Sequence, residues 1–250
     1  MHTLFISDLH LSDVRPGQLV AFRNLLGGPA RYASHIYILG DLFEAWAGDD
    51  DDSPGHEEIQ TIIRDCVNSG TKISVMRGNR DYLLGKRFAE KTGVELLPDI
   101  VTVNLYGKDV LLMHGDLLCT RDWQYQWMRR IINNRPAICL FLCLPLSIRK
   151  RIWHGVRNLT QQSVADKLPE IMDVDEESIR KLIQKYPVDW LIHGHTHRPN
   201  DHEINFANRT VHRYVLGDWY QQDSVLVVDD KSCQRMTVAN YADYVSAQSA

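Results

Sequence analysis

The stretch "TLFISDLH", residues 3–10, joins a short apolar run to an acidic and an imidazole side chain, Asp8 and His10. A run of this length and composition predicts a buried β-strand. Side chains two residues apart, such as Asp8 and His10, can both point to one place where the chain leaves the strand. The same arrangement recurs along the chain in "IYILGDLF" (36–43), "ISVMRGNRD" (73–81), "VLLMHGD" (110–116), "WLIHGHTH" (190–197) and "RYVLGDW" (213–219). Each is predicted to be a strand whose carboxyl end presents hydrogen-bonding or metal-binding groups.

Helix-like patterns lie between the early strands, at residues 16–27 and 57–70, the second stopped by Gly70. Alternation of strand and helix predicts an α/β (α+β) fold with its functional groups at the strand ends. Turns near Gly107 and near residues 229–231 indicate that later strands pair antiparallel. We therefore expect residues 1–250 to form one domain in which two mixed sheets pack together, flanked by helices.

Composition places the chain among ordinary globular proteins. It has 250 residues, of which 44% are hydrophobic and 24% are charged. The five cysteines are odd in number and include no C-x-x-C pair, which argues for a reducing compartment and against a disulfide framework or a zinc ribbon. An acidic residue, Asp8, already occurs within the first ten residues, which is not typical of a secretory signal or a transit peptide. We therefore expect a cytoplasmic protein.

One segment differs from the rest in charge. Residues 123–165 contain no acidic residue and seven basic ones: Arg129, Arg130, Arg135, Arg149, Lys150, Arg151 and Arg157. This leaves 21 basic residues against 32 acidic ones, a formal charge of −11, in the rest of the chain. Such segregation suggests that the segment faces something anionic. The acidic run 49–52 is interpreted as a solvated loop, with Asp49 as an alternative support for the site.

The same segment is helix-like and contains an apolar run over residues 137–148, interrupted by Pro145. A run of a dozen residues is too short to span a bilayer, which needs roughly twenty. Two interpretations fit this run: a helical hairpin that buries its own apolar faces, and an apolar surface rimmed by arginine that meets acyl chains or a membrane. Both interpretations can hold, since one helix can pack inward and another outward.

Five groups at the predicted strand ends carry metal-binding side chains: Asp8-x-His10, Gly40-Asp41, Gly78-Asn79, His114-Gly115-Asp116 and His193-Gly194-His195-Thr196-His197. Carboxylate, amide and imidazole ligands without thiolate suit Mn²⁺, Fe²⁺ or Zn²⁺. The blocks resemble, in order, those of the calcineurin-like metallophosphoesterases. The resemblance implies two metal ions that share Asp41. Asp8, His10 and His197 would complete one site, and Asn79, His114 and His195 the other. His193 and Asp116 would be supporting residues.

Arg80 occupies the position after Gly-Asn at which many relatives have histidine. Histidine helps an alkoxide to leave, whereas a phosphate leaving group, whose last pKa is near 6, needs little help. Arginine cannot act as a general acid near neutral pH, but it grips phosphate oxygens with two donors. Arg80 therefore indicates a pyrophosphate substrate.

Longer stretches narrow the resemblance: "GNRDYLLGKRF" (78–88), "LLMHGDLLCTRD" (111–122) and "IMDV" (171–174) are similar to the UDP-2,3-diacylglucosamine diphosphatases of Gram-negative lipid A synthesis. This similarity implies attack by a metal-held water on the α phosphorus, giving UMP and 2,3-diacylglucosamine 1-phosphate (lipid X). It also implies Mn²⁺ and a peripheral position at the cytoplasmic face of the inner membrane. Residues 121–170 would be a helical, lipid-binding lid.

The same resemblance assigns individual roles. Catalysis would fall to Asp41, Asn79, Arg80, His114 and His195. Substrate contacts would fall to Asn79, Arg80, Asp122, Tyr125, Arg157, Thr160, Val164, Lys167 and His195. Two of these depart from the family pattern, since Thr160 replaces a serine and Val164 replaces a polar residue.

Three other functions compete with this one. A diphosphatase or phosphodiesterase for soluble nucleotides would use the same metal ligands but would not need the apolar segment. A non-catalytic scaffold of this fold would be expected to have lost a ligand, and none is missing. A nuclease would use the basic segment for DNA, but its interleaved Leu, Ile and Cys residues resemble a lipid groove more than a phosphate track. We expect neither a nucleic-acid partner nor an obligatory protein partner.

Overall fold

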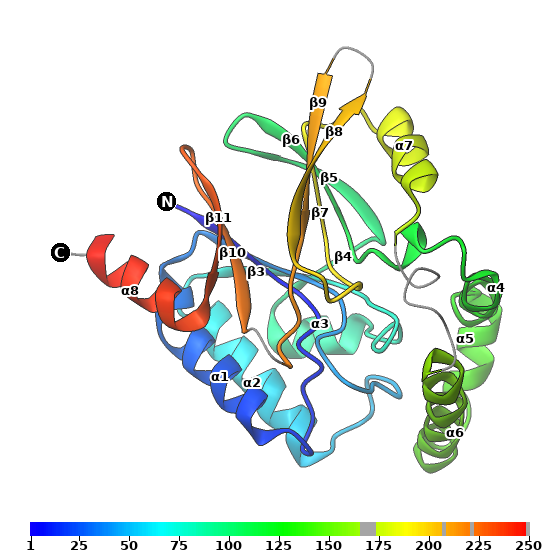
Figure 1. The fold of residues 1–250 in the computed structure, drawn as a ribbon. Helices are drawn as coiled ribbons and strands as arrows, with labels where there is room; N and C mark the ends of the chain where they lie inside the picture. The colour runs from blue at the N-terminus through cyan, green and yellow to red at the C-terminus, as the bar shows by residue number, and fades with distance from the viewer. Residues whose placement is uncertain (166–173, 207–208, 221–222, 249–250) are drawn as a thin grey trace.

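Two β-sheets pack face to face, and helices cover their outer sides (Figure 1). The computed structural model describes residues 1–165, 174–206, 209–220 and 223–248, and of residues 124 and 158–165 the backbone alone. The prediction of two packed sheets is confirmed. None of the helices in the described part of the chain has the length and apolar content needed to cross a bilayer.

The first sheet has the order β11–β10–β1–β2–β3–β4. Its four strands from the first part of the chain run parallel. Of the two strands from the last part, β10 is antiparallel to β1, and β11 is antiparallel to β10 and so runs in the direction of the first four. The strands are β1 (Thr3–Ile6), β2 (His35–Leu39), β3 (Lys72–Met76), β4 (Glu95–Leu97), β10 (Ser224–Val228) and β11 (Cys233–Thr237). The carboxyl ends of the parallel strands therefore meet at one edge.

The second sheet has the order β5–β6–β7–β9–β8. Its three inner strands run parallel, and each outer strand is antiparallel to its neighbour. The strands are β5 (Ile100–Leu105), β6 (Lys108–Met113), β7 (Trp190–His193), β8 (Asn200–Phe206) and β9 (Arg209–Val215). The antiparallel pairs predicted from the turns near Gly107 and residues 229–231 are β5–β6 and β10–β11, so that prediction is confirmed.

Alternation along β1 divides the interior into two cores. Leu4 and Ile6 face the core between the first sheet and its helices, while Phe5 faces the core between the two sheets. Successive side chains of a strand point to opposite faces, so one apolar run serves both cores. Each of these side chains is fully buried, which contributes about 1.5–3 kcal/mol per residue. A strand buried on both faces has continuous rather than alternating hydrophobicity, as in "TLFI".

Local signals set the helix ends. Pro16 and Pro54 each occupy the first helical position of α1 and α2, and Gly93 follows α3 with a left-handed backbone, φ 78°. The helices outside the insertion are α1 (Pro16–Gly27), α2 (Pro54–Asn68), α3 (Lys86–Thr92), α7 (Glu176–Lys185) and α8 (Val238–Gln248), with short 3₁₀ turns η1 (Pro29–Tyr32) and η2 (Asp116–Leu118). The tail after Met236, from which the sequence predicts nothing, thus forms the end of β11 and then α8, whose Tyr241 is buried in the first core.

Three helices of the insertion stand to one side of the sheets (Figure 1). They are α4 (Trp123–Ile132), α5 (Arg135–Leu142) and α6 (Leu146–Ala165). Four of the seven basic residues of the segment pair with carboxylates elsewhere in the chain: Arg129 with Asp99 and Asp116, Arg149 with Asp50, Lys150 with Asp51, and Arg157 with Glu44. For these four residues the anionic partner is the protein itself.

The acidic run at residues 49–52 contains carboxylates that pair with the insertion, namely Asp50 with Arg149 and Asp51 with Lys150. The interpretation of this run as a solvated loop is wrong for Asp49 and Asp51. Asp51 is buried and contacts Lys150 at 2.6 Å. Asp49 accepts hydrogen bonds from the backbone of Gly85 and Phe88 and from the Trp46 indole. Asp49 therefore stabilises the loop itself, while Asp50 and Asp51 bind the insertion.

Candidate active site

The loops that follow the parallel strands are joined by backbone hydrogen bonds at the edge where both sheets end. The His10 amide donates to the Asp41 carbonyl at 2.9 Å, and the Gly194 amide donates to the His114 carbonyl at 2.8 Å. Each bond links a loop of one strand to the loop of its neighbour. The geometry thereby brings together all seven side chains predicted as metal ligands: Asp8, His10, Asp41, Asn79, His114, His195 and His197.

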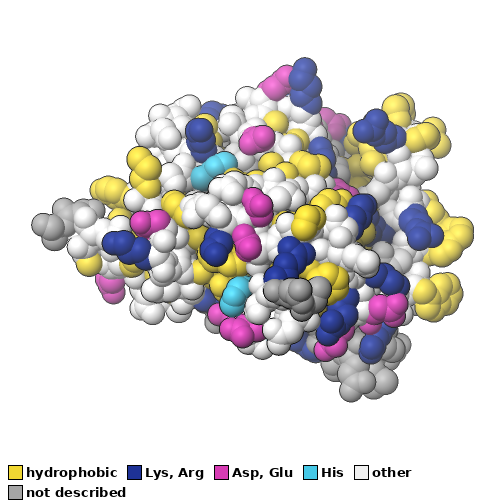
Figure 2. Space-filling view, turned by 90° about the horizontal axis from the view of Figure 1, so that it is seen from above, with side chains coloured by type: hydrophobic (Ala, Val, Ile, Leu, Met, Phe, Trp, Pro, Cys, Tyr) yellow, Lys and Arg dark blue, Asp and Glu magenta, His cyan; other side chains and the backbone are white. Residues whose placement is uncertain are grey.

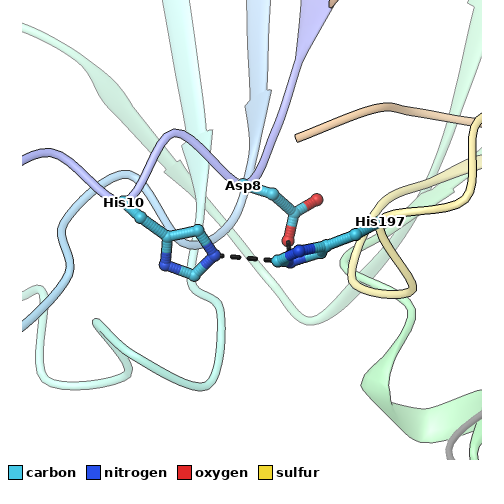
Figure 3. A group of neighbouring side chains, drawn as sticks. All are labelled: Asp8, His10 and His197. Carbon is cyan, nitrogen blue, oxygen red and sulfur yellow. Dashed lines mark hydrogen bonds and ion pairs between the residues drawn. The ribbon is translucent and has the colours of Figure 1, made fainter. Parts of the chain in front are cut away.

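One group consists of Asp8, His10 and His197, drawn in Figure 3. His197 Nε2 lies 3.4 Å from Asp8 Oδ1 and 3.4 Å from His10 Nε2. The other carboxylate oxygen of Asp8 accepts hydrogen bonds from Ser7 Oγ at 2.6 Å and from the His195 amide at 2.9 Å. Asp8 is therefore fixed through one oxygen, while the other faces the two imidazoles.

Asp41 lies between this group and a second one that contains His114. Asp41 Oδ2 is 3.7 Å from His10 Nε2, and Asp41 Oδ1 is 3.8 Å from His114 Nε2. The amide oxygen of Asn79 is within hydrogen-bonding distance of both His114 Nε2, at 3.1 Å, and His195 Nδ1, at 3.0 Å. One carboxylate thus faces both groups, as the bridging role expected of Asp41 requires.

Backbone strain is concentrated at these ligands. Seven non-glycine residues in the described part of the chain have positive φ, and five of them are predicted ligands: Asp8, His10, Asp41, His195 and His197. The left-handed region costs an L-residue about 1–2 kcal/mol, and such strain clusters at functional sites. The left-handed turns aim successive side chains inward at a strand end. The conformation is retained because the surrounding structure fixes it.

Glycine at two positions is needed for the close approach of the loops. A Cβ added to Gly78 would lie 2.1 Å from Asp41 Oδ1, and one added to Gly194 would lie 2.3 Å from Asp8 Oδ2. Both distances are far inside van der Waals contact, so the "GN" and "GH" glycines make room for the carboxylates.

The buried charges perturb one another strongly. Burial, reinforced by the carboxylates of Asp81 and Asp8, raises the pKa of Asp41 to about 7. Burial opposes the charged form of His114, but the carboxylates of Asp41 and Asp8 outweigh it and raise the pKa of His114 to about 9. Burial and the nearby His114 lower the pKa of His195 to about 4. Protons on Asp41 and His114 therefore compensate the buried negative charge of the cluster, and a bound cation would compensate the same charge.

The residues present fit a divalent metal ion. Asp8 Oδ1 is completely buried and has no hydrogen-bond partner among the described residues, an arrangement that is costly unless a cation is bound. The donors are carboxylate and amide oxygens and imidazole nitrogens, which suit Mn²⁺, Fe²⁺ or Zn²⁺.

Three of the imidazoles are oriented by groups behind them. His10 Nδ1 lies 3.7 Å from Glu44, His197 Nδ1 lies 3.4 Å from Asp218, and His114 Nδ1 lies 2.8 Å from the Leu39 carbonyl. Each therefore turns Nε2 toward the cluster, the arrangement by which supporting groups orient metal-bound histidine. The sequence analysis missed Glu44 and Asp218. "RYVLGDW" gave a signal for Asp218 in its strand-end Gly-Asp, whereas Glu44 had none.

Asp116 and His193 were predicted as supporting residues. Asp116 Oδ2 accepts hydrogen bonds from the Tyr125 hydroxyl at 2.9 Å and from Arg129 Nε at 2.5 Å. His193 is fully buried behind the cluster, and its Nδ1 lies 2.9 Å from the Gly194 carbonyl. Asp81, for which no role was predicted, is also fully buried and accepts hydrogen bonds from the amides of Gly78, Leu42 and Phe43.

A cavity of about 1100 Å³ extends from the cluster to the insertion. His10, Asp41, Asn79, His195 and His197 line one end. The opposite walls are apolar and come largely from α4, α5 and α6: Met128, Ile131, Ile132, Ala137, Ile138, Phe141, Leu142, Ile152, Trp153 and Val156.

Arg80 lines the cavity between the metal-binding end and the apolar walls. Its side chain forms no ion pair with a carboxylate of the described residues, and its buried Nε has no hydrogen-bond partner among them. Its backbone amide donates to Asp41 Oδ1 at 2.8 Å. Arg80 is therefore held beside the cluster with its charge available to a ligand.

The other predicted substrate contacts divide into two sets. Asp122, Tyr125 and Arg157 line the cavity, and the Tyr125 ring lies 6.1 Å from that of His195. Thr160 and Val164 belong to α6, but their side chains, like the whole of Lys167, lie outside the described residues.

Sequence comparison identifies the family. The model of the calcineurin-like phosphoesterases matches residues 1–199. The chain belongs to the calcineurin-like phosphoesterase family. All five strand-end blocks lie within the matched part, and the fold of this family implies that divalent metal ions are bound.

Curated relatives match nearly the whole chain. A UDP-2,3-diacylglucosamine hydrolase of Enterobacter sp. (strain 638) is 44% identical over 234 residues, which is 94% of this chain and 98% of the relative. Proteins of the same name from Salmonella paratyphi B and Photorhabdus laumondii are 46% and 45% identical and cover 91% and 93% of this chain, with 95% and 97% of their own lengths.

Solved structures are more distant. An archaeal phosphodiesterase covers 94% of this chain and 99% of its own, with 14% identity and a TM-score of 0.45. The phosphoesterase YfcE of E. coli covers 96% of this chain and 95% of its own, with 14% identity and a TM-score of 0.47. At such values the likeness adds nothing to the family assignment.

Replacement of Asp41 by Asn should separate metal binding from folding stability. Above pH 7 the buried Asp41 carboxylate is charged beside those of Asp8 and Asp81. Because its pKa in the folded protein is raised, its contribution to the free energy of unfolding falls as pH rises from about 4 to about 7. Asn keeps an oxygen for the Arg80 amide and carries no charge. The metal-free D41N protein should therefore be more stable at pH 8, by about 1 kcal/mol or more.

Thermal unfolding with and without a chelator measures both effects. Added Mn²⁺ should raise the melting temperature of the unmodified protein, since a ligand that binds only the folded state stabilises it. The D41N variant should respond weakly. An equal response of both proteins would exclude Asp41 as a ligand.

Proposed function

We propose that this protein hydrolyses the pyrophosphate bond of UDP-2,3-diacylglucosamine to give UMP and lipid X, in lipid A biosynthesis. The name shared by relatives that match more than nine-tenths of the chain supports this substrate. The observation that carries the proposal is one cavity lined by the cluster, by apolar walls and by Arg80, which has no ion-pair partner among the residues that the structure describes.

Two Mn²⁺ ions per chain are part of this proposal. Asp8, His10 and His197 would hold one ion, Asn79, His114 and His195 the other, and Asp41 would contact both. The distances from Asp41 to His10 and His114 support this division. When bound, such a pair of ions supplies a nucleophile derived from water and neutralises charge on the phosphate.

The side chains would divide the remaining work. Arg80 would hold the pyrophosphate by its non-bridging oxygens, since guanidinium presents two parallel donors to a phosphate. The group that leaves is a sugar 1-phosphate, a weak base, so no general acid is required at this position. Asn79 and His195 adjoin Arg80 at the cavity wall and would orient the same phosphate.

The two acyl chains would occupy the apolar part of the cavity, between the domain formed by the sheets and the insertion of residues 121–170. Phe141, Ile152 and Trp153 are among its walls. Asp122, Tyr125 and Arg157 would contact the polar head, together with Thr160, Val164 and Lys167. The substrate would thus need both the insertion and the cluster.

The outer face of the insertion suits a membrane surface. Four of the large hydrophobic side chains exposed on the described part of the insertion do not line the cavity: Trp123, Trp127, Leu140 and Ile148. Trp123, Trp127 and Leu140 are 68%, 62% and 74% exposed. In Figure 2 hydrophobic and basic side chains are interspersed at the right-hand end of the molecule, which α4, α5 and α6 form. We propose a peripheral position on the cytoplasmic face of the inner membrane, where exposed Trp and Arg favour the headgroup region.

The substrate assignment predicts a strong preference for the acylated compound. With Mn²⁺, release of UMP from UDP-2,3-diacylglucosamine should exceed release from the deacylated compound by about 100-fold or more, because burial of each acyl CH₂ stabilises the complex by about 0.8 kcal/mol. Quantification of UMP measures both reactions. Equal rates would indicate instead a hydrolase of soluble nucleotides.

Replacement of Arg80 by Ala should discriminate between substrates. Activity on UDP-2,3-diacylglucosamine should fall by about 100-fold or more, since a charge-assisted bidentate contact is lost. Activity on an activated aryl phosphate, which has no pyrophosphate, should fall much less. R77A, which changes a neighbouring arginine whose Nε already donates to the Leu84 carbonyl, is the control. Similar losses on both substrates would refute the proposed role of Arg80.

Replacement of Trp123 and Trp127 by Ala should weaken membrane binding. Sedimentation with vesicles that contain an anionic lipid should show a severalfold loss of bound protein, because two exposed indoles are removed. Neither residue lines the cavity, so hydrolysis of substrate in detergent should be retained. V20A removes an exposed side chain on α1 as a control. Unchanged vesicle binding of the Trp variant would exclude this face.

A further inference from the structure

Glu44 lies in the loop after β2 and contacts four separate parts of the molecule. It is buried, with 6% exposure. Its Oε2 accepts a hydrogen bond from the Tyr220 hydroxyl at 3.0 Å and lies 3.4 Å from Arg15 Nη1 and 3.7 Å from His10 Nδ1. Its Oε1 lies 2.5 Å from Arg157 Nη2. One carboxylate therefore joins the predicted metal ligand His10 to the insertion helix α6.

The contact with His10 bears on the metal centre. His10 Nδ1 is buried and, apart from its approach to Glu44, has no hydrogen-bond partner among the described residues. The Tyr220 ring stacks on the same imidazole with centroids 5.0 Å apart. A carboxylate behind Nδ1 favours the tautomer with its proton there, which leaves Nε2 free to face Asp41 and His197.

The contact with Arg157 depends on the docking of α6. Two turns earlier in the helix, the buried Arg149 donates to the Ala47 carbonyl at 2.5 Å and pairs with Asp50, and Lys150 pairs with Asp51. These contacts fix the start of α6 on the loop that immediately follows Glu44. Arg157 then reaches Glu44 over the cavity, with its guanidinium 5.5 Å from the Trp153 ring.

Removal of Arg157 from this position would leave the negative charge of the buried Glu44 with one fewer cationic partner. A buried carboxylate that loses one partner is destabilised in its position and lowers its free energy by moving toward water. Such a movement would take the Glu44 carboxylate away from His10 Nδ1. A change in the insertion would thus reach the metal-binding cluster through a single side chain.

We propose that Glu44 is a positioning residue that couples the docking of α6 to the orientation of His10 in the metal centre. The inference rests on the proposed function only in that it takes His10 to be a metal ligand. Through Glu44, a docked insertion favours the metal-binding tautomer of His10, and a bound metal in turn favours the docked insertion.

The test measures metal affinity without turnover. Metal-depleted protein is titrated with Mn²⁺ in a calorimeter, for the unmodified chain, E44Q, R157Q and the double variant. E44Q should lose about 10–100-fold in affinity, the usual effect of removing a group behind a metal-bound histidine. R157Q should lose severalfold, and the double variant should be no weaker than E44Q alone, because both changes act on one pathway.

Two further variants separate this coupling from general damage. K150Q breaks an ion pair of the same helix but leaves the contact between Glu44 and Arg157 in place, so it should lower Mn²⁺ affinity less than R157Q does, and only as far as it loosens α6 in hydrogen exchange. E44D keeps the charge and should recover part of the affinity lost in E44Q. Hydrogen exchange of α6 in the unmodified protein should slow when Mn²⁺ binds.

Either of two results would overturn the proposal: an E44Q protein that binds Mn²⁺ as the unmodified chain does, or a K150Q protein that loses as much affinity as R157Q. Additive losses in the double variant would show that the two residues act separately and would also overturn it. If the unmodified chain bound no Mn²⁺, the metal centre itself would be at fault. If it bound Mn²⁺ but released no UMP, only the proposed substrate would fail.

Discussion

Mutual compensation of buried charges at the edge of two sheets is the constraint on which the rest of this structure depends. Asp8, Asp41 and Asp81 are almost completely buried within one small region. Carboxylates so placed cannot all be charged unless positive groups lie among them, and the imidazole of His114 supplies only part of that charge. The family fold implies divalent ions, which would meet this constraint, and the backbone is left-handed at five of the seven predicted ligands.

In the insertion, by contrast, much of the charge is compensated by carboxylates of the protein and needs no bound ion. Arg129, Arg149, Lys150 and Arg157 each pair with carboxylates of the two-sheet domain. Its apolar residues are left to line a cavity on one side and to face solvent on the other. Ion pairs thus help to hold the three helices on the domain, while of their apolar residues Ile138 and Phe141 pack against the first core.

The cluster and the insertion both line the cavity, whose walls present different chemical groups to a ligand. The cluster offers oxygens and nitrogens that can bind a metal, Arg80 offers a guanidinium that pairs with no carboxylate of the described residues, and the helices offer apolar walls. An amphiphilic phosphate compound matches that order, whereas a soluble nucleotide would leave most of the walls exposed to water. Glu44 gives the two ends a direct physical connection, since it contacts both His10 and Arg157.

The sequence by itself predicted six of the strands, the antiparallel pairs β5–β6 and β10–β11, and the seven side chains at the cluster, because each of these side chains follows an apolar run and parallel strands share one end. It did not predict β4, β8 or the antiparallel pairs β1–β10 and β8–β9. The same local logic could not find Glu44 or Asp81, or foresee that Asp51 is buried. These residues acquire their partners only when distant segments meet: Arg149 donates to Ala47, 102 residues away. Residue spacing encodes periodicity within an element, but pairing of charges between elements depends on how the elements pack. Only the tertiary structure decided that the basic segment binds its own domain.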